Sequence, residues 1–144
     1  MVELVPATKA EIRADYLYFE NGMTEIIRKV QAKFVAADIY HHLMQGKIHL
    51  YWIEEGMDRL GFVILSQYDS GYEEMPTLVI DHLWLTPGLD VFAEAIAAGH
   101  DLANQLGVER IEFNSARLGW GKRVKELGFE PAFVTYHFQV NRNG

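Results

Sequence analysis

Apolar residues in the first third of the chain recur three and four positions apart, which is the spacing of amphipathic helices. A short apolar strand at residues 2–5 precedes them. Thr8 is followed three positions later by Glu11, the pattern of a capping box at the start of a helix. We expect helices that start at Thr8, Thr24 and Asp38, with a break at Asn21-Gly22 and a last end at Gly46.

The middle of the chain changes to the composition of strands. Residues 48–53 and 60–65 are rich in β-branched and aromatic side chains and flank a polar turn, so they predict a hairpin. Residues 68–76 contain a glycine and two glutamates and predict an exposed connection. Residues 77–85 are a third strand, which the Thr-Pro-Gly sequence at 86–88 ends.

The last third of the chain alternates between helical and strand patterns. We expect a helix over 91–106 with Asp90 as its N-cap, a strand at 110–114, a helix at 117–127 and a final strand at 133–140. A strand-helix-strand crossover favours parallel pairing of its two strands. The sequence therefore predicts an α/β fold with a mixed central sheet flanked by helices.

The composition fits one domain over residues 1–144, because the length is typical of a single domain and 49% of the residues are hydrophobic. The absence of cysteine excludes a disulfide scaffold, a cysteine-ligated zinc site and a thiol nucleophile. No apolar run approaches the length of about 18 residues that a membrane span needs, and the first residues lack the pattern of a secretory signal. We therefore expect a cytoplasmic protein without a membrane segment.

The net charge of −7 argues against general binding of nucleic acid, which needs clustered basic residues. The charge is unevenly distributed, since residues 110–144 hold six basic and three acidic side chains. An acidic body with one basic corner suits a small anionic ligand or an acidic patch on a partner. The alternative is an ordinary solvated helix surface.

The order of elements and three local motifs resemble the GNAT superfamily of N-acyltransferases over nearly the whole chain. The motifs are Gly61-Phe62 in the hairpin, Leu83-Trp84-Leu85-Thr86-Pro87 at the end of the third strand, and Leu127-Gly128-Phe129-Glu130-Pro131. The resemblance implies that acetyl-CoA binds where the strand 77–85 and the next strand separate. It also implies that the following helix turns its N-terminus toward the pyrophosphate, where free amides and the helix dipole favour an anion. The cofactor-binding positions that it implies are Leu83, Trp84, Leu85, Gly88, Leu89, Asp90, Val91, Asn114, Arg117 and Arg123.

Two elements of the family pattern are missing. The loop before the helix at 91–106 is short, has one glycine and no basic residue, and ends in Asp90, whose carboxylate would repel a phosphate or simply cap the helix. Val124 occupies the position of the tyrosine that protonates the leaving thiolate in many members. Tyr136 is the candidate substitute for this general acid, and packing in the last strand is its alternative role. Arg117 and Arg123 could contact the cofactor phosphates or belong to a charged helix face.

Transfer of an acyl group to an amine needs a base that works near neutral pH. Asp81 and His82 lie on the strand that would border the acceptor, and either is a candidate base, directly or through water. Strict alternation predicts that they point to opposite faces of the sheet, with His82 on the face of Ile80 and Trp84. No metal site is expected, because the adjacent histidines His41-His42 cannot chelate one ion from a helix.

Two functions are compatible with these features. One is an acetyl-CoA-dependent N-acyltransferase whose acceptor is the amine of a small molecule or of a lysine side chain. The other is a catalytically inactive GNAT-like fold that acts through protein contacts, as a phage accessory or virion protein does. Either protein could form a homo-oligomer.

Overall fold

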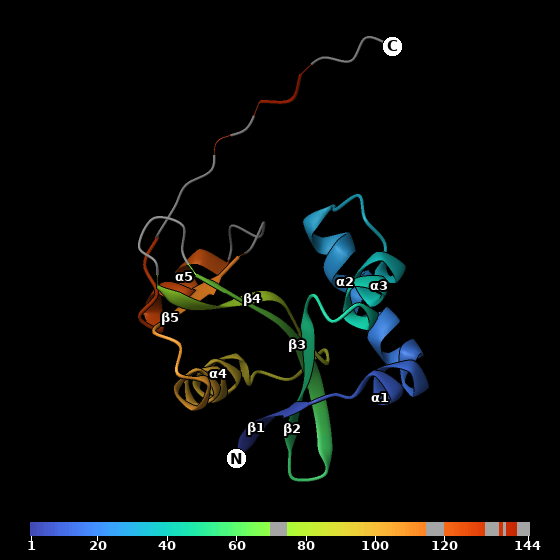
Figure 1. Ribbon diagram of the computed structural model, residues 1–144, viewed down its shortest axis with the longest axis horizontal. Helices are drawn as coiled ribbons and strands as arrows, with labels where there is room; N and C mark the ends of the chain where they lie inside the picture. Colours follow the sequence, from blue (N-terminus) through green and yellow to red (C-terminus); the bar gives the residue numbers. More distant parts are fainter. Residues whose placement is uncertain (70–74, 115–119, 132–135, 137, 141–144) are drawn as a thin grey trace.

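The computed structural model describes residues 1–69, 75–114, 120–131, 136 and 138–140. Within this part of the chain, five strands form one sheet in the order β1-β2-β3-β4-β5 (Figure 1). Neighbouring strands are antiparallel except for β4 and β5, which are parallel. The mixed α/β sheet is thus confirmed. The strands are β1 (Val2–Pro6), β2 (His49–Glu55), β3 (Asp58–Asp69), β4 (Pro76–Leu85) and β5 (Arg110–Phe113).

Helices cover both faces of the sheet and enclose two apolar cores. One core lies under the first three helices and contains Phe19, Trp52 and Phe62. The other lies between the sheet and α4, with the apolar side of α5 at its margin, and contains Val63 and Ile96. The helices are α1 (Lys9–Ala14), α2 (Tyr16–Val30), α3 (Ala36–Met44), α4 (Phe92–Leu106) and α5 (Trp120–Glu126) (Figure 1).

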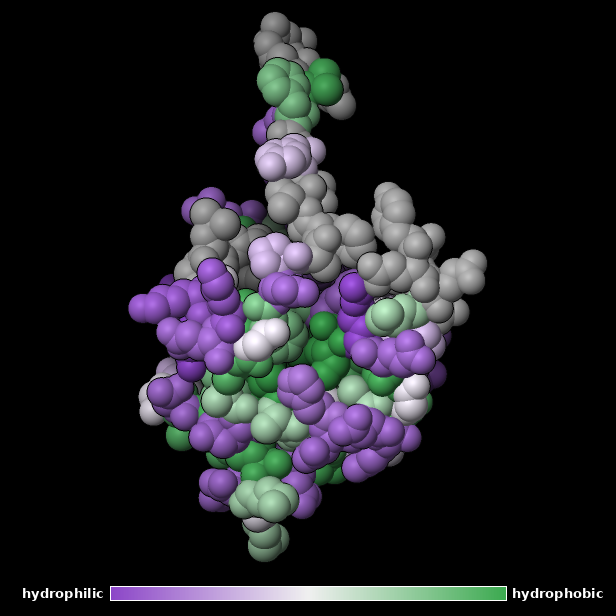
Figure 2. Space-filling model, turned by 90° about the vertical axis from the view of Figure 1, so that its left-hand side faces the viewer, coloured by the Kyte–Doolittle hydropathy of each residue, from purple (hydrophilic) through white to green (hydrophobic). Residues whose placement is uncertain are grey.

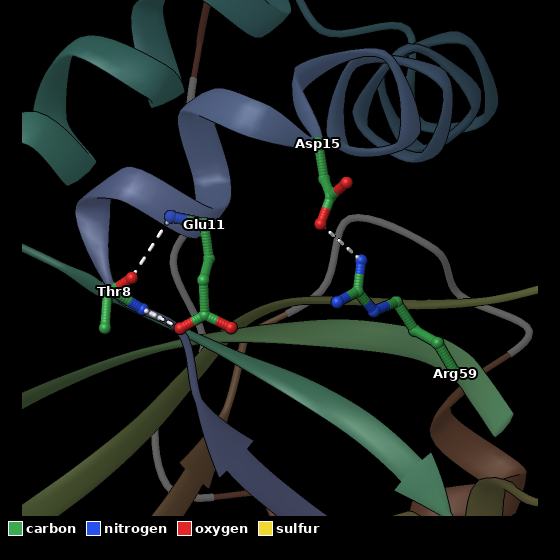
Figure 3. A network of polar contacts seen from close by, with 4 residues as sticks. All are labelled: Thr8, Glu11, Asp15 and Arg59. Atoms are coloured by element: carbon green, nitrogen blue, oxygen red, sulfur yellow. Dashed lines mark hydrogen bonds and ion pairs between the residues drawn. The ribbon is translucent and has the colours of Figure 1, made fainter. Parts of the chain in front are cut away.

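The N-terminal end of α1 has the predicted capping box. The backbone N–H of Glu11 donates to Thr8 Oγ1 at 3.1 Å, and the Glu11 carboxylate accepts from the Thr8 N–H at 3.0 Å (Figure 3). The helix stops one turn later, before Asp15, whose carboxylate binds Arg59 of β3 at 2.9 Å (Figure 3). This contact between Asp15 and Arg59 ties the junction of α1 and α2 to the sheet.

The break predicted at Asn21-Gly22 is wrong, because α2 runs through this pair and through Thr24. Gly22 is buried in the helix at the point where α2 approaches the sheet. A Cβ atom there would overlap the Phe62 ring and lie 2.8 Å from Trp84 Cδ2. The glycine therefore permits close packing of helix and sheet rather than ending the helix. Asp38 also has a different position from the predicted N-cap: it is the third residue of α3, and its carboxylate accepts from the Val35 N–H at 2.9 Å.

We expect Gly22→Ala to lower the free energy of unfolding by about 1–2 kcal/mol, because overpacking against the buried Phe62 outweighs the gain in helix propensity. Gly99→Ala in α4 is the matched control, since a Cβ there meets nothing within 4 Å. This control variant should be more stable than the wild type by about 0.5–1 kcal/mol. Urea unfolding of both variants tests the pair, and equal stabilisation by the two substitutions would contradict this packing.

The C-terminal third departs from the prediction at the start of α4. Helix α4 follows Val91 rather than Asp90, and no side chain caps it. The last helix is described from Trp120, with residues 115–119 outside the described part. As predicted, the chain turns at Gly128, where φ is +95° and the Phe129 N–H donates to the Val124 carbonyl at 3.0 Å.

The predicted final strand at 133–140 lies partly outside the described residues. Tyr136 and residues 138–140 are described, and they are not in a strand. The side chains of Tyr136, Phe138 and Val140 are exposed. In the described residues, β5 is therefore the last strand of the sheet.

Candidate functional site

The strands β4 and β5 pair over only part of their length. Their parallel register runs from Thr77 opposite Arg110 to Ile80 opposite Phe113, and a last bond joins the Asn114 N–H to the Ile80 carbonyl at 3.3 Å. Beyond Ile80, β4 continues to Leu85 while staying paired with β3 on its other edge. Among the described residues, no strand pairs with β4 at 81–85 on the β5 side.

The direction of the main-chain groups in this stretch follows from one hydrogen bond. The Thr86 N–H donates to the Leu60 carbonyl at 2.8 Å and so points toward β3. Because N–H and C=O groups of successive residues point to opposite edges of a strand, those of Leu83 and Leu85 point toward the β5 side. This edge of β4 offers hydrogen-bonding groups to an extended ligand.

A β-bulge interrupts the pairing of β3 and β4 at the same place. Ile64 lies opposite His82, but the next residue, Leu65, lies opposite Ile80, so Asp81 is an extra residue in β4. A bulge of this kind redirects the side chains around it and often lies next to an active site. Strict alternation therefore fails here.

Asp81 and His82 face the same side of the sheet because of the bulge. The Asp81 carboxylate accepts a hydrogen bond at 2.7 Å from Ser66, which shares its face of β3 with the core residue Ile64. The His82 ring packs against Phe34, which belongs to that same core, with ring centres 5.9 Å apart. The prediction of opposite faces is thus wrong, and so is the placing of Ile80 beside His82, since Ile80 belongs to the core under α4.

Burial changes the ionisation of both side chains. It raises the pKa of Asp81, while the Ser66 hydrogen bond and the nearby His82 act in the opposite direction. It lowers the pKa of His82 below its ordinary value of 6.5, and Asp81 partly offsets this. His82 is therefore a neutral imidazole at pH 7 and can accept a proton.

The side chains of β4 beyond the bulge divide between the two cores. Leu83 and Leu85 pack against the core under α4. Trp84 points the other way, into the core under α2, where its indole N–H donates to Glu25 at 2.9 Å. The Trp84 side chain therefore does not contact a ligand that binds on the β5 side of β4.

The N-terminal end of α4 contains an ion pair instead of a glycine-rich loop. Asp90 binds Arg123 of α5 at 2.9 Å. The Arg123 guanidinium also lies 4.6 Å from the centre of the Phe92 ring. Phe92 is buried and packs edge-on against Phe113 at the end of β5. Asp90 thus holds a cation near the start of α4, and Phe92 packs between that cation and the end of β5.

The other residues predicted for the cofactor lie around this end of the sheet. Gly88 has a φ of +91° in the turn that follows β4, and Leu89 in the same turn is exposed. Val91 is half-buried and packs against the core under α4. Asn114 is exposed directly after β5. Arg117 lies outside the described residues.

The two candidates for a general acid lie in different surroundings. Val124, which replaces the expected tyrosine, packs against the core under α4. Tyr136 is 90% exposed and has no described contact with Asp81 or His82. The role of Tyr136 as an acid stays a prediction.

Sequence reasoning missed the polar side chains of β3 and β5 that surround Asp81. Ser66 binds Asp81, and two residues later the Tyr68 hydroxyl donates to Glu112 of β5. Arg110 lies 3.9 Å from the same Glu112 carboxylate. The sequence feature that could have revealed these residues is a pair of hydroxyl side chains, Ser66 and Tyr68, two positions apart at the end of an apolar run. Within the described residues no group of three His, Asp or Glu side chains lies close enough to hold a metal ion.

A separate groove of about 990 Å³ follows the outer edge of β5, between α4 and α5. Figure 2 views the molecule from this side and shows apolar side chains in the middle of the face, with hydrophilic ones around them. The groove is lined by Asn114 and Glu112 but by none of residues 81–85.

No helix among the described residues is both long and apolar enough to cross a membrane.

Comparisons with known proteins agree on the architecture. No protein-family model and no curated protein matches the chain. Among solved structures it is similar to a ribosomal-protein-alanine N-acetyltransferase from Brucella melitensis biovar Abortus 2308, with a TM-score of 0.72, 14% identity, and coverage of 98% of this chain and 100% of that one. It is also similar to an aminoglycoside acetyltransferase from an uncultured soil metagenomic sample, solved in complex with sisomicin, with a TM-score of 0.66, 10% identity and 97% coverage of both chains.

A third similar structure is a putative acetyltransferase from Bacillus subtilis, with a TM-score of 0.65, 15% identity, and coverage of 99% of this chain and 100% of that one. All three similarities extend over nearly the whole chain at identities too low to carry over a substrate or a catalytic residue. The chain therefore has the GNAT fold, in a form whose sequence has diverged far from these acetyltransferases.

Proposed function

We propose that the protein is an acetyl-CoA-dependent N-acyltransferase whose acceptor is an amine. The observation that carries the proposal is the combination at one point of β4: the strand leaves β5 after Ile80, and the bulge there turns both Asp81 and His82 to the face of α2 and α3. A donor along the open edge and an acceptor on that face would meet beside both titratable groups.

The residues beside β4 fit the arm of this cofactor better than its phosphates. The main-chain groups of Leu83 and Leu85 point to the open edge and can pair with the amides of pantetheine. Acetyl-CoA supplies the acyl group as an activated thioester. Near the start of α4, Arg123 provides a cation for the pyrophosphate, while Asp90 competes with that anion for the same guanidinium.

Proton transfer is assigned to His82, with Asp81 as its charge partner. A neutral imidazole can take the proton that an attacking ammonium or amine must lose. The Asp81 carboxylate, turned to the same face, stabilises the imidazolium that forms. Asp81 alone, or a water bound to it, is the alternative base.

The acceptor is proposed to be cationic, either a small molecule with several amines or a lysine side chain. Residues 1–109 carry the acidic excess of the chain, and Asp81 is the acidic residue of β4 on the proposed acceptor side. An acidic surface raises the local concentration of a cation and its rate of association. One similar structure is that of an aminoglycoside acetyltransferase.

A second function is favoured by the packing at the gap. Phe92 packs against Phe113 at the end of β5, and the Arg123 guanidinium that pairs with Asp90 lies over the Phe92 ring, so this end of the sheet holds packed side chains in place of a glycine-rich loop. A GNAT fold without cofactor could instead act through protein contacts, for which the groove along β5, lined by both apolar and charged side chains, is the candidate surface.

Calorimetric titration with acetyl-CoA separates the two functions, and Asp90→Asn sharpens the test. If the cofactor phosphate uses Arg123, neutralising Asp90 removes a competitor and should tighten binding about two- to fivefold, since a charge at a helix N-terminus is worth ~0.3–1 kcal/mol. Asp101→Asn, which makes the same charge change further along α4, should leave the affinity nearly unchanged. No binding at millimolar acetyl-CoA by wild type and Asp90→Asn would favour the second function.

A further inference from the structure

The bulge leaves the position of Asp81 dependent on side-chain contacts. In the regular part of the sheet each residue of β4 has a partner in β3 that fixes its side-chain direction, but the register passes from His82 to Ile80 and omits Asp81. An extra residue of this kind lacks its own partner in the ladder. Some other contact must hold the carboxylate toward the face of His82.

Ser66 makes that contact. It lies opposite Val79 in β3, at the end of a run of fully buried apolar residues, 62–65. Its hydroxyl donates to Asp81 Oδ2 at 2.7 Å, and both side chains are partly buried. A hydroxyl that donates to a carboxylate favours the ionised form and fixes its direction.

The other polar groups near Asp81 are engaged with one another. The Tyr68 hydroxyl, two residues along the same face of β3, donates to Glu112 of β5. Arg110 of β5 pairs with that same carboxylate. From β4 itself, the charge of His82 acts on Asp81. The uncharged Phe34, between α2 and α3, packs against the His82 ring. Within the described residues, the hydrogen bond to the Asp81 side chain thus comes from Ser66.

We propose that Ser66 is a positioning residue of the acyl-transfer site, which acts by holding the Asp81 carboxylate beside His82 through the 2.7 Å hydrogen bond. This inference rests on the proposed function. Its chemical consequence is that the hydrogen bond opposes the effect of burial and favours the ionised form of Asp81, whose negative charge supports His82 when it takes up a proton. Without the hydroxyl, Asp81 would stay protonated up to a higher pH and would stabilise the His82 imidazolium less.

The test compares Ser66→Ala with Ser66→Thr and Tyr68→Phe. Threonine keeps the hydroxyl and suits a strand, so it should rescue the wild-type behaviour. Tyr68→Phe removes a hydroxyl from the same face of the same strand, but one that binds Glu112. It is therefore the control for the loss of a neighbouring hydroxyl.

The first measurement is the titration of the Asp81 carboxyl carbon by NMR in the free protein, assigned with Asp81→Asn. We expect the pKa of Asp81 to rise in Ser66→Ala, because the hydrogen bond that favours the carboxylate is gone. Ser66→Thr and Tyr68→Phe should titrate like the wild type. An unchanged Asp81 titration in Ser66→Ala, or an equal shift in Tyr68→Phe, overturns the proposal.

The second measurement is the pH dependence of kcat, with thiol release from acetyl-CoA followed in the presence of sisomicin, spermidine or a lysine peptide. In Ser66→Ala the loss of kcat that accompanies protonation of Asp81 should begin at a higher pH, and kcat at pH 7 should fall about tenfold, the effect of one hydrogen bond to a charged group, with KM for acetyl-CoA within twofold. A shifted Asp81 titration in a protein that acylates none of these amines overturns the proposed function and the catalytic role of Ser66, while the hydrogen bond stands.

Discussion

Replacement of His82 by glutamine is expected to lower kcat for acyl transfer about 10²- to 10⁴-fold, the usual contribution of a positioned general base. Glutamine keeps a polar group of similar size against Phe34 but cannot take up a proton. KM for acetyl-CoA should change little, because the cofactor is proposed to bind along the β5-facing edge of β4 and not on the face that carries His82. Thiol release with sisomicin, spermidine or a lysine peptide measures the loss.

The control is His49→Gln, which changes an exposed histidine of β2 that lies opposite Leu65, on the α4 side of the sheet. It should retain the wild-type kcat. A His82→Gln enzyme with wild-type kcat would show that His82 is not the base and would leave Asp81, or a water bound to it, in that role.

His82→Gln should also make the stability of the fold less sensitive to acid. The pKa of His82 is lowered in the folded protein, so the unfolded chain binds this proton more readily. The stabilisation that His82 provides is complete above pH 6.5 and is lost as the pH falls from there through the folded-state pKa. Between pH 7.5 and 5, urea unfolding should show a smaller loss of stability for His82→Gln than for the wild type.

Gly61→Ala is expected to destabilise the sheet strongly. Gly61 lies in β3 opposite Leu85, and a Cβ atom there would fall on the carbonyl oxygen of Trp84 and lie 2.9 Å from Leu85 Cα. Both neighbours are backbone atoms of β4, so relief requires the two strands to part. We expect the free energy of unfolding to fall by about 3 kcal/mol or more, which is at the upper end for overpacking.

The measurement is urea unfolding, with Gly121→Ala in α5 as the control, because a Cβ at Gly121 meets nothing within 4 Å. The control should unfold at the wild-type urea concentration or slightly above it. If Gly61→Ala unfolded at the same concentration as the control, β3 and β4 would not approach as closely as the structure shows.

Regular patterns in the sequence predicted most of the fold. The alternation and composition of residues 48–65 specify the hairpin of β2 and β3, and Thr8 with Glu11 specifies the start of α1. Gly22 shows why local reasoning fails elsewhere: a glycine next to an asparagine is typical of a helix end, but here it serves a contact with Phe62, which is 40 residues away. Only the tertiary structure distinguishes the two uses of glycine.

The geometry around Asp81 and His82 was not predicted, and their role as candidate bases stays a prediction. Asp81 and His82 were identified from the type of side chain and the strand that carries them. Their common face depends on one extra residue in β4, and nothing in residues 77–85 distinguishes a bulged strand from a regular one. A local pattern predicts that Asp90 caps α4, but its carboxylate pairs with Arg123, 33 residues later in the chain.

The most direct test of the central claim is amide hydrogen exchange at Leu83 and Leu85, measured by NMR with and without acetyl-CoA. If the β5-facing edge of β4 holds the cofactor, these two amides exchange readily in the free protein and become protected by at least tenfold when it binds. The Thr86 amide, which is already bonded to β3, should keep its rate. Binding that leaves Leu83 and Leu85 unprotected, or amides that are protected before any cofactor is added, would contradict the account.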